Sequence, residues 1–175
     1  MKFKTIYVDP PWPEIGGGRI RRGADRHYPL MRVKEIIALP VIKLVADNAH
    51  LYLWATNNFL RDAFDVMDAW GFRYVTMITW VKPKIGLGQY FRGMTEHCLF
   101  GVRGVLPYKI IGGKRQQGRT MICTTQLRAH SVKPYEMRQM IEKVSYGPRL
   151  ELFARERRPG WRVWGNEVES DVELI

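Results

Sequence analysis

Short apolar segments that suit β-strands alternate along this chain with amphipathic segments that suit α-helices. The strand-like segments are rich in branched and aromatic residues and cover residues 4–9, 50–56, 73–82, 96–104, 120–124, 149–155 and 161–167. Helical periodicity is found in residues 32–46, with a break at Pro40, and in residues 57–70 and 134–144. Alternating strands and helices predict an α/β domain with a mainly parallel sheet, whose ligands bind beyond the carboxyl ends of the strands.

Length and composition narrow the class of protein. The chain has 175 residues, of which 46% are hydrophobic and 26% charged, so we expect one globular domain over residues 1–175. No apolar run reaches the roughly 20 residues of a membrane span, and the first residues lack a signal peptide's apolar stretch, so we expect a cytoplasmic protein. Two cysteines and four scattered histidines exclude a disulfide framework and predict no structural metal.

The charge of the chain points to nucleic acid. There are 28 Lys and Arg against 17 Asp and Glu, a net charge of +11 with a pI near 9.9. Five basic residues and no acidic one lie between Arg103 and Arg119, and four arginines crowd the glycine-rich residues 13–27. We interpret Lys114, Arg115 and Arg119 as phosphate contacts, with a solvated basic loop as the alternative.

The motif with the clearest chemistry is Asp9-Pro10-Pro11-Trp12, which follows the first apolar segment. The prolines have fixed φ angles and no N–H, so they form a rigid turn whose carbonyls can point at a ligand. Asp9 adds a carboxylate acceptor and Trp12 a flat apolar face. Together these residues can hold an amino group and stack on the ring that bears it. The alternative is a strand that ends in a Pro-Pro turn with a core tryptophan.

Adenine is a ring of this kind. Its exocyclic amine is a poor nucleophile because the nitrogen lone pair is delocalised into the ring. Acceptors bound to its two hydrogens push electron density onto nitrogen and favour the tetrahedral geometry of attack. A positively charged sulfonium methyl donor is the natural electrophile for that nitrogen.

The chain resembles the DPPW-motif family of adenine amino-methyltransferases. This family includes the catalytic subunit of the eukaryotic mRNA adenosine methyltransferase and small bacterial and phage enzymes. Six further segments follow DPPW in the family's order and spacing: LYLWATN (51–57), WGFRYVTMITWVK (70–82), EHCLFGVRG (96–104), HSVKP (130–134), RLELFAR (149–155) and WGNE (164–167). The resemblance implies a Rossmann-like, S-adenosylmethionine-dependent fold with its motifs in permuted (β-class) order.

The resemblance also assigns roles to single residues. Asp9, Pro10, Pro11 and Trp12 would form the catalytic turn, with Asp9 near the target amine or the methionine amino group. Tyr28 stands where the family has an aromatic residue near the target base. The cofactor-binding positions would be Lys133 at the carboxylate, Arg155 near the ribose, Asn166 and Glu167 at the ribose hydroxyls or adenine, and Arg157 where some members have histidine.

Alternative functions stay open at this stage. Degenerate family members act as non-catalytic scaffolds, but they alter the DPPW motif, which is intact here. A methyltransferase for small molecules or proteins fits the net charge less well. We favour DNA over RNA, with the adenine single-stranded or flipped out, because the small size resembles the bacterial and phage members. The sequence leaves open whether the chain acts alone, as a homodimer or in a heteromer.

Three other sequence features resemble functional motifs. Glu96 and His97 are adjacent and could be taken for a catalytic dyad, but we interpret His97 as a packed histidine near a strand end. His130 precedes the Lys133-Pro134 turn, and we expect it only to shape that turn. Gly16, Gly17 and Gly18 lack the residues that follow a phosphate-binding glycine loop, so we interpret them as a flexible segment.

Overall fold

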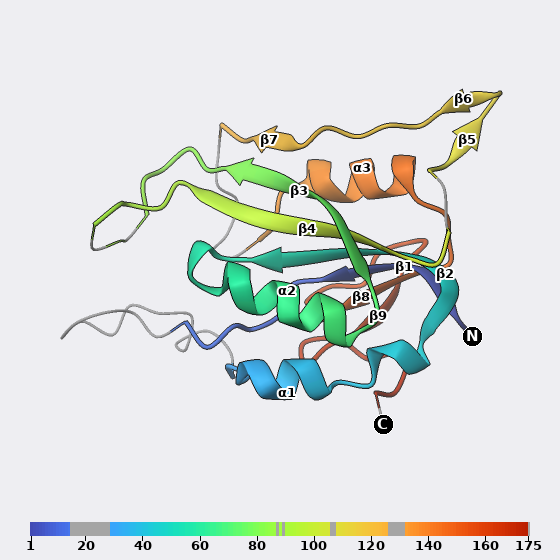
Figure 1. Ribbon diagram of the computed structural model, residues 1–175, viewed down its shortest axis with the longest axis horizontal. Coiled ribbons are helices and arrows are strands. Elements are labelled where there is room, and N and C mark those ends of the chain that lie inside the picture. Colours follow the sequence, from blue (N-terminus) through green and yellow to red (C-terminus); the bar gives the residue numbers. More distant parts are fainter. Residues whose placement is uncertain (15–28, 87, 89, 106–107, 126–131, 175) are drawn as a thin grey trace.

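A seven-stranded sheet forms the centre of the molecule (Figure 1). The computed structural model describes residues 1–14, 29–86, 88, 90–105, 108–125 and 132–174. The strands of the sheet, in the order β7-β3-β4-β2-β1-β8-β9, are β1 (Phe3–Val8), β2 (Val45–Ala55), β3 (Arg73–Val81), β4 (Thr95–Arg103), β7 (Met121–Cys123), β8 (Arg149–Leu152) and β9 (Arg162–Trp164). All run parallel except β4, which pairs antiparallel with β2 and β3. The expected Rossmann-like α/β fold is confirmed.

Helices cover both faces of this sheet. They are α1 (Val33–Ala38), α2 (Leu60–Ala69) and α3 (Tyr135–Val144), with 3-10 turns η2 (Val41–Lys43) and η3 (Asn57–Phe59). Helix α2 buries Ala63, Val66 and Met67 in one apolar cluster, which α1 joins through Ile36. Helix α3 buries Met137 and Ile141 in a second cluster with aromatic side chains of the sheet. Such one-sided burial is what the 3.6-residue spacing of the apolar residues predicts.

The parallel strands bring distant parts of the chain to one edge. Strands β1, β3, β8 and β9 all end there, so Asp9, the β3–β4 hairpin (residues 82–94) and the segments after β8 and β9 share what we call the carboxyl edge. Lys133 reaches the same edge because it directly precedes the first turn of α3. The pairing of β1 with β8, which lie near opposite ends of the chain, is consistent with the permuted motif order expected from the sequence.

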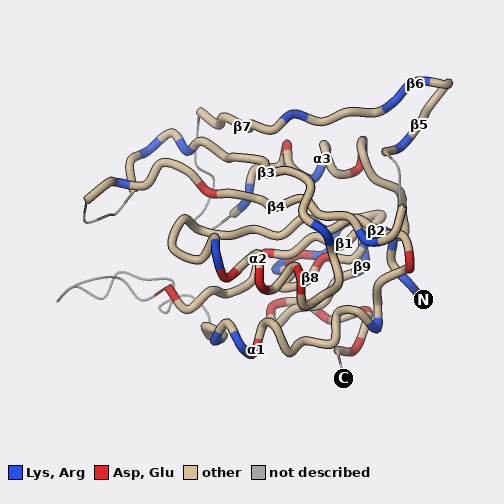
Figure 2. The backbone as a smooth tube through the Cα atoms, in the orientation of Figure 1, with Lys and Arg blue, Asp and Glu red and all other residues tan. Residues whose placement is uncertain are grey.

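The opposite edge carries a small hairpin that sequence periodicity does not predict. Strands β5 (Ile110–Ile111) and β6 (Lys114–Arg115) pair antiparallel within the segment expected to be a basic loop. The Lys109 N–H donates to the Val144 carbonyl at 2.8 Å, which ties the hairpin to the C-terminal end of α3. We call this side the amino edge, and Figure 2 shows its basic residues at the upper right.

Two strand boundaries also differ from expectation. Strand β2 begins at Val45 rather than near His50. The polar residues Asp47 and Asn48 interrupt the apolar pattern in its first half, so the pattern does not predict that part of the strand. Strand β8 ends at Leu152 because Phe153 adopts a φ of 60°. A bulky residue with positive φ breaks the strand and turns the chain at the carboxyl edge. None of the described helices is long and apolar enough to cross a membrane.

Candidate active site

The Asp-Pro-Pro-Trp turn is held by a series of backbone hydrogen bonds. The Trp12 N–H donates to the Pro10 carbonyl at 2.9 Å, and the Met31 N–H donates to the Pro11 carbonyl at 2.9 Å. Each prolyl carbonyl therefore accepts one hydrogen bond within the chain and keeps a second lone pair. The motif is rigid, and the Asp9 carboxylate adds a charged acceptor beside these carbonyls.

Trp12 lies in the core instead of forming an open stacking face. Its side chain is only 4% exposed, and its ring stacks on Phe59 with centroids 5.7 Å apart and planes 10° apart. Its Nε1–H donates to the carbonyl of Trp54 at 2.9 Å. The expected role as a base-stacking surface is therefore wrong for this structure, because the ring is occupied by Phe59 and covered by the fold. Trp12 instead ties the turn to β2.

Asp9 belongs to a chain of four alternating charges at the carboxyl edge. Lys133 Nζ lies 2.8 Å from Asp9 Oδ2 and 3.2 Å from Glu96 Oε2, and Glu96 Oε1 also accepts a hydrogen bond from Lys82. Both lysine ammonium groups sit near indole rings, Lys133 at 5.4 Å from the Trp54 centroid. The Asp9 side chain is 26% exposed, so a ligand can reach its carboxylate.

Burial and pairing shift the pKa values of these groups in different directions. Burial raises the pKa of Asp9 above its ordinary value, and Lys133 only partly offsets this. Burial also opposes ionisation of Glu96, but two lysines outweigh it, and the pKa of Glu96 is lowered. Burial opposes the charge of Lys133 as well, yet Asp9 and Glu96 together hold its pKa above the ordinary range. The cluster therefore combines a permanently charged lysine with an aspartate of raised basicity.

A cleft opens beside this cluster, between β1, β8 and the start of α3. It is lined by Tyr7, Asp9, Val132, Lys133, Pro134, Tyr135, Arg138, Glu151, Phe153, Arg155, Glu156 and Arg158. Glu151 is buried, and its Oε1 pairs with Arg138 at 2.5 Å. Its Oε2 has no hydrogen-bond partner among the described residues. A buried acceptor without a partner is costly, and burial raises the pKa of Glu151 above its ordinary value.

A residue with strained backbone, Phe153, lines this cleft. Phe153 lines the cleft directly after β8, and its ring packs edge-on against Trp164 at 5.2 Å. Positive φ in a bulky residue costs free energy that the surrounding packing must supply. The turn makes room beyond β8 and brings Arg155 to the cleft.

The structure brings together some of the expected cofactor residues and separates others. Asp9, Lys133 and Arg155 line one cleft, and Arg155 Nε lies 3.6 Å from Glu167 Oε1 in the turn after β9. Asn166 is exposed in that same turn. Arg157 was expected at the cofactor, but its guanidinium donates to the Glu169 carbonyl and pairs with Asp171 at 2.5 Å. The irregular segment after Phe153 turns Arg157 toward the C-terminal tail, and Arg158 faces the cleft instead.

The expected substrate residues are widely spread. Tyr28 lies outside the described residues, as do His130 and Gly16, Gly17 and Gly18. Lys114 and Arg115 are exposed on the β5–β6 hairpin at the amino edge, across the sheet from Asp9. Arg119 is exposed beside α3, where its N–H donates to Met140 Sδ at 3.1 Å.

Sequence reasoning missed Glu96, Lys82 and Glu151 as members of the site. Glu96 was considered only as a partner of His97, but neighbours in a strand face opposite sides of a sheet. His97 Nδ1 instead lies 3.1 Å from Thr79 Oγ1, so the packed interpretation of His97 fits and no dyad forms. A charged residue inside an otherwise apolar strand, such as Glu151 in RLELF, was the available clue.

Comparison with protein families decides what this arrangement belongs to. The MT-A70 family model matches residues 3–167, which include every described group of the cleft. The chain belongs to the MT-A70 family. The family assignment from the DPPW motif is therefore confirmed.

Named relatives of this MT-A70 chain include enzymes of very different length. It is 29% identical over 195 residues to the type II methyltransferase M.MunI of a Mycoplasma species, covering 99% of this chain and 81% of that protein. It is 29% identical over 183 residues to the human N(6)-adenosine-methyltransferase catalytic subunit METTL3, covering 97% of this chain but 29% of METTL3. It is 30% identical over 196 residues to the Drosophila melanogaster N(6)-adenosine-methyltransferase MT-A70-like protein, again covering 29% of that protein.

Proposed function

We propose that this MT-A70 chain transfers a methyl group from S-adenosylmethionine to the N6 amine of adenine in nucleic acid, with DNA favoured over RNA. The observation that carries the proposal is the partly exposed Asp9 carboxylate, which lines one cleft together with Lys133, Arg155 and the buried carboxylate of Glu151. The family match and the names of the relatives support the same reaction.

The residues of the cleft fit this cofactor chemically. S-adenosylmethionine supplies an electrophilic methyl group on a sulfonium centre, along with an amino-acid zwitterion, ribose hydroxyls and an adenine. The Glu151 Oε2 acceptor suits an ammonium group, and Lys133 and Arg155 suit a carboxylate or a hydroxyl. Glu167 and Asn166, in the turn after β9, extend the site toward hydroxyl groups.

Asp9 has the properties of the group that receives the target amine. Its Oδ1 can accept a hydrogen bond from the N6 amine, which raises electron density on nitrogen. As the N–C bond forms and the sulfur–carbon bond breaks, the nitrogen becomes positively charged and must lose one proton. A carboxylate of raised pKa is a better acceptor for that proton than an ordinary aspartate.

The preference for DNA is supported by one relative, the type II methyltransferase M.MunI. The chain covers 81% of M.MunI but less than a third of METTL3, whose longer chain carries further segments. A non-catalytic scaffold is the second candidate function, and the intact DPPW motif argues against it. The deciding experiment incubates the pure protein with labelled methyl donor and with matched DNA and RNA oligonucleotides, followed by nucleoside analysis. N6-methyladenine in neither substrate would leave the scaffold as the better function.

Replacing Lys133 with alanine is expected to weaken S-adenosylmethionine binding by about 1.5–3 kcal/mol, the scale of a charged hydrogen bond. The change also leaves Asp9 and Glu96 without their shared cation, so the cleft loses positive charge beside the cofactor carboxylate. Isothermal calorimetry measures the affinity, with Lys143→Ala, an exposed lysine of α3, as the control. Equal affinity in the Lys133 variant and the control would remove Lys133 from the cofactor site.

Replacing Lys114, Arg115 and Arg119 with alanine tests the basic segment. Because Lys114 and Arg115 lie at the amino edge, we expect the slope of log K against log salt to flatten for long nucleic acids, by about 0.7–0.9 per lost phosphate contact. A trinucleotide is too short to reach beyond the carboxyl edge, so its slope of log K against log salt should be the same for the wild type and the triple variant. Anisotropy titrations over a salt series measure both, and an unchanged slope for the long substrate would show that this segment does not contact nucleic acid.

A further inference from the structure

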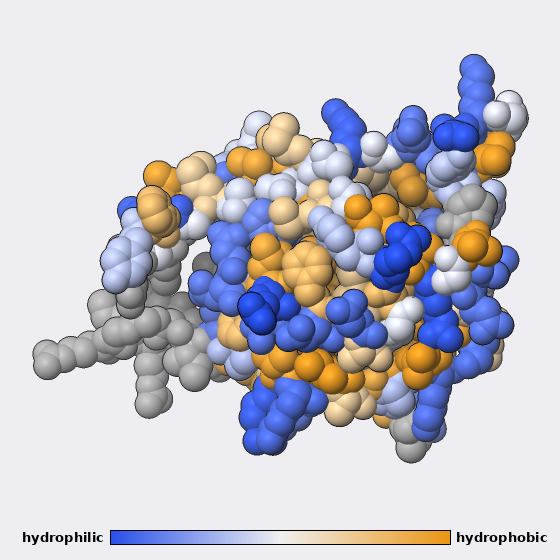
Figure 3. All heavy atoms as spheres, viewed as in Figure 1, coloured by the Kyte–Doolittle hydropathy of each residue, from blue (hydrophilic) through white to orange (hydrophobic). Residues whose placement is uncertain are grey.

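The tip of the β3–β4 hairpin exposes two adjacent aromatic side chains. Tyr90 and Phe91 are each 92% exposed, and Ile85 and Met94 beside them are also exposed. In Figure 3 the end of this hairpin stands out from the body of the molecule at the left. Single exposed apolar residues are common, but a cluster that includes two aromatic rings marks a binding surface.

The hairpin that carries these rings is internally supported. The Lys82 N–H donates to the Met94 carbonyl and the Gly86 N–H to the Gly93 carbonyl, both at 2.7 Å. The Arg92 Nε–H donates to the Gly86 carbonyl at 2.9 Å. A Cβ on Gly86 would lie 2.9 Å from the Gly93 carbonyl oxygen, so glycine is needed where the two arms approach. The aromatic pair therefore projects from a braced hairpin and not from a loose chain end.

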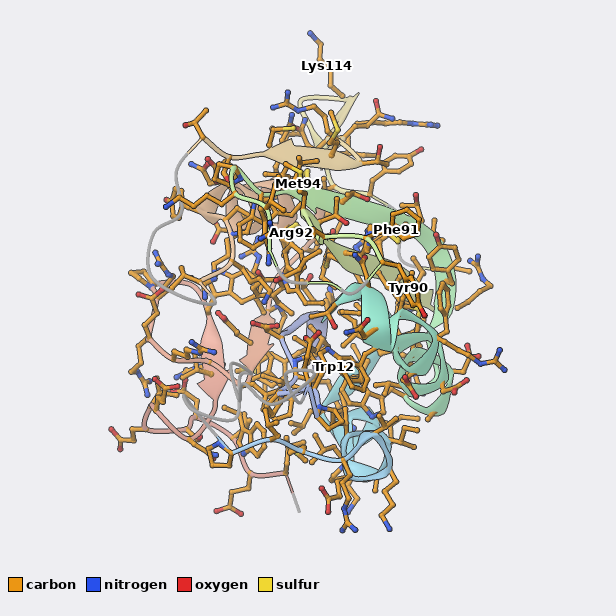
Figure 4. The ribbon with its side chains drawn as sticks, turned by 90° about the vertical axis from the view of Figure 1, so that its left-hand side faces the viewer. Trp12, Tyr90, Phe91, Arg92, Met94 and Lys114 are labelled. Carbon is orange, nitrogen blue, oxygen red and sulfur yellow. The ribbon has the colours of Figure 1, made fainter. Side chains whose placement is uncertain are left out.

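The base of the hairpin is part of the charge cluster of the candidate active site. Its two arms begin at Lys82 and end one residue before Thr95, and Lys82 is hydrogen-bonded to Glu96, which shares Lys133 with Asp9. Figure 4, which looks onto the carboxyl edge, shows Tyr90, Phe91, Arg92 and Met94 above Trp12. The base of the hairpin therefore belongs to the charge cluster that contains Asp9.

The charge around these rings favours one kind of binding partner. Lys84 and Arg92 lie in residues 83–95, and no acidic residue does. Positive charge next to exposed aromatic rings suits a polyanion with flat apolar bases, which is how sequence-tolerant single-strand binding sites are built. A protein partner would need no such excess of positive charge.

We propose that Tyr90 and Phe91 form a stacking platform for the bases that flank the target adenine, with Arg92 and Lys84 near the adjoining phosphates. The proposal rests on the proposed function, since it assumes a nucleic-acid substrate. Turning the target adenine out toward Asp9 breaks its stacking on both neighbours. The platform replaces part of the stacking that those neighbours lose.

The test compares the double variant Tyr90→Ala/Phe91→Ala with Ile42→Ala, an exposed apolar residue of the 3-10 turn η2. Anisotropy with a single-stranded oligonucleotide containing one adenine is expected to show at least about tenfold weaker binding for the first variant and wild-type binding for the second. Cofactor affinity should be unchanged in both.

A second measurement locates the contact. Oligonucleotides carrying 5-iodouracil beside the adenine should crosslink to Tyr90 or Phe91, as identified by mass spectrometry. Equal affinity of the two variants, or crosslinks only elsewhere, would overturn the platform. The platform would also be overturned if the Tyr90/Phe91 variant kept its oligonucleotide affinity but had a lower oligomeric mass than the wild type. That result would show that the hairpin binds a second copy of the chain. If the wild-type protein itself methylates no nucleic acid, the proposed function fails instead, whatever the variants do.

Discussion

Replacing Asp9 with alanine is expected to slow single-turnover methylation by about 10²–10³-fold, the usual cost of losing one preorganised group that stabilises developing charge. The Asp9 side chain is 26% exposed and offers a charged acceptor to the target amine, whereas the carbonyls of Pro10 and Pro11 each already accept one backbone hydrogen bond. The loss should therefore fall on turnover and not on substrate affinity. Rapid-quench assays with a labelled methyl donor measure the rate, and oligonucleotide binding is followed separately.

Folding should survive this change, which keeps the result interpretable. Lys133 retains Glu96 at 3.2 Å when Asp9 is removed, so no buried cation is left without a partner. Asp65→Ala, on the exposed side of α2, is the matched control, and it should turn over like the wild type. Near-normal turnover in the Asp9→Ala variant would contradict the catalytic assignment and favour a scaffold.

The pH dependence of the wild-type rate provides a second readout of the same group. The reaction needs ionised Asp9, and burial raises its pKa above the ordinary value. The rate should therefore fall as pH drops through this raised pKa, in a range where an ordinary aspartate would still be ionised. Glu96, whose pKa is lowered, should stay ionised through that range and keep Lys133 in place.

Much of the fold and the centre of the site could be predicted because they depend on local sequence. The period of apolar residues gave the strands β1, β3 and β4 and the helices α2 and α3 nearly to their ends. Asp9 was proposed from the compact DPPW motif, and Lys133 from the resemblance of HSVKP (130–134) to the family. Placing both at one edge needed only the rule that ligands bind at the carboxyl ends of parallel strands.

The rest depends on contacts between residues far apart in the chain. Glu96 joins the site only because β4 pairs with β2 and brings its first residues toward Lys133, 37 positions further on. Arg157 and Arg158 are indistinguishable by type, and the unusual φ of Phe153 decides which of them faces the cleft. Lys114 and Arg115 were read from charge alone, which says nothing about the edge at which they lie.

Trp12 shows how tertiary packing reassigns a residue in an otherwise well-predicted motif. An aromatic residue after Asp-Pro-Pro can stack on a base or fill the core, and its own neighbours in sequence do not distinguish these roles. The choice is made by Phe59, which covers the ring, and by the Trp54 carbonyl, which accepts its Nε1–H. Both partners lie more than forty residues away.

Replacing Trp12 with alanine is accordingly expected to lower the free energy of unfolding by about 3–5 kcal/mol, the cost of emptying a buried aromatic site. That is a large share of the roughly 5–15 kcal/mol that stabilises a typical domain. Trp12→Phe keeps the stacking on Phe59 but removes the donor to Trp54, so its cost should be about 1–3 kcal/mol. Urea unfolding measures both, and oligonucleotide affinity of the folded protein separates the two roles. A base-stacking Trp12 would weaken that affinity in the alanine variant without loss of stability, whereas a core Trp12 loses stability first, and its phenylalanine variant binds substrate like the wild type.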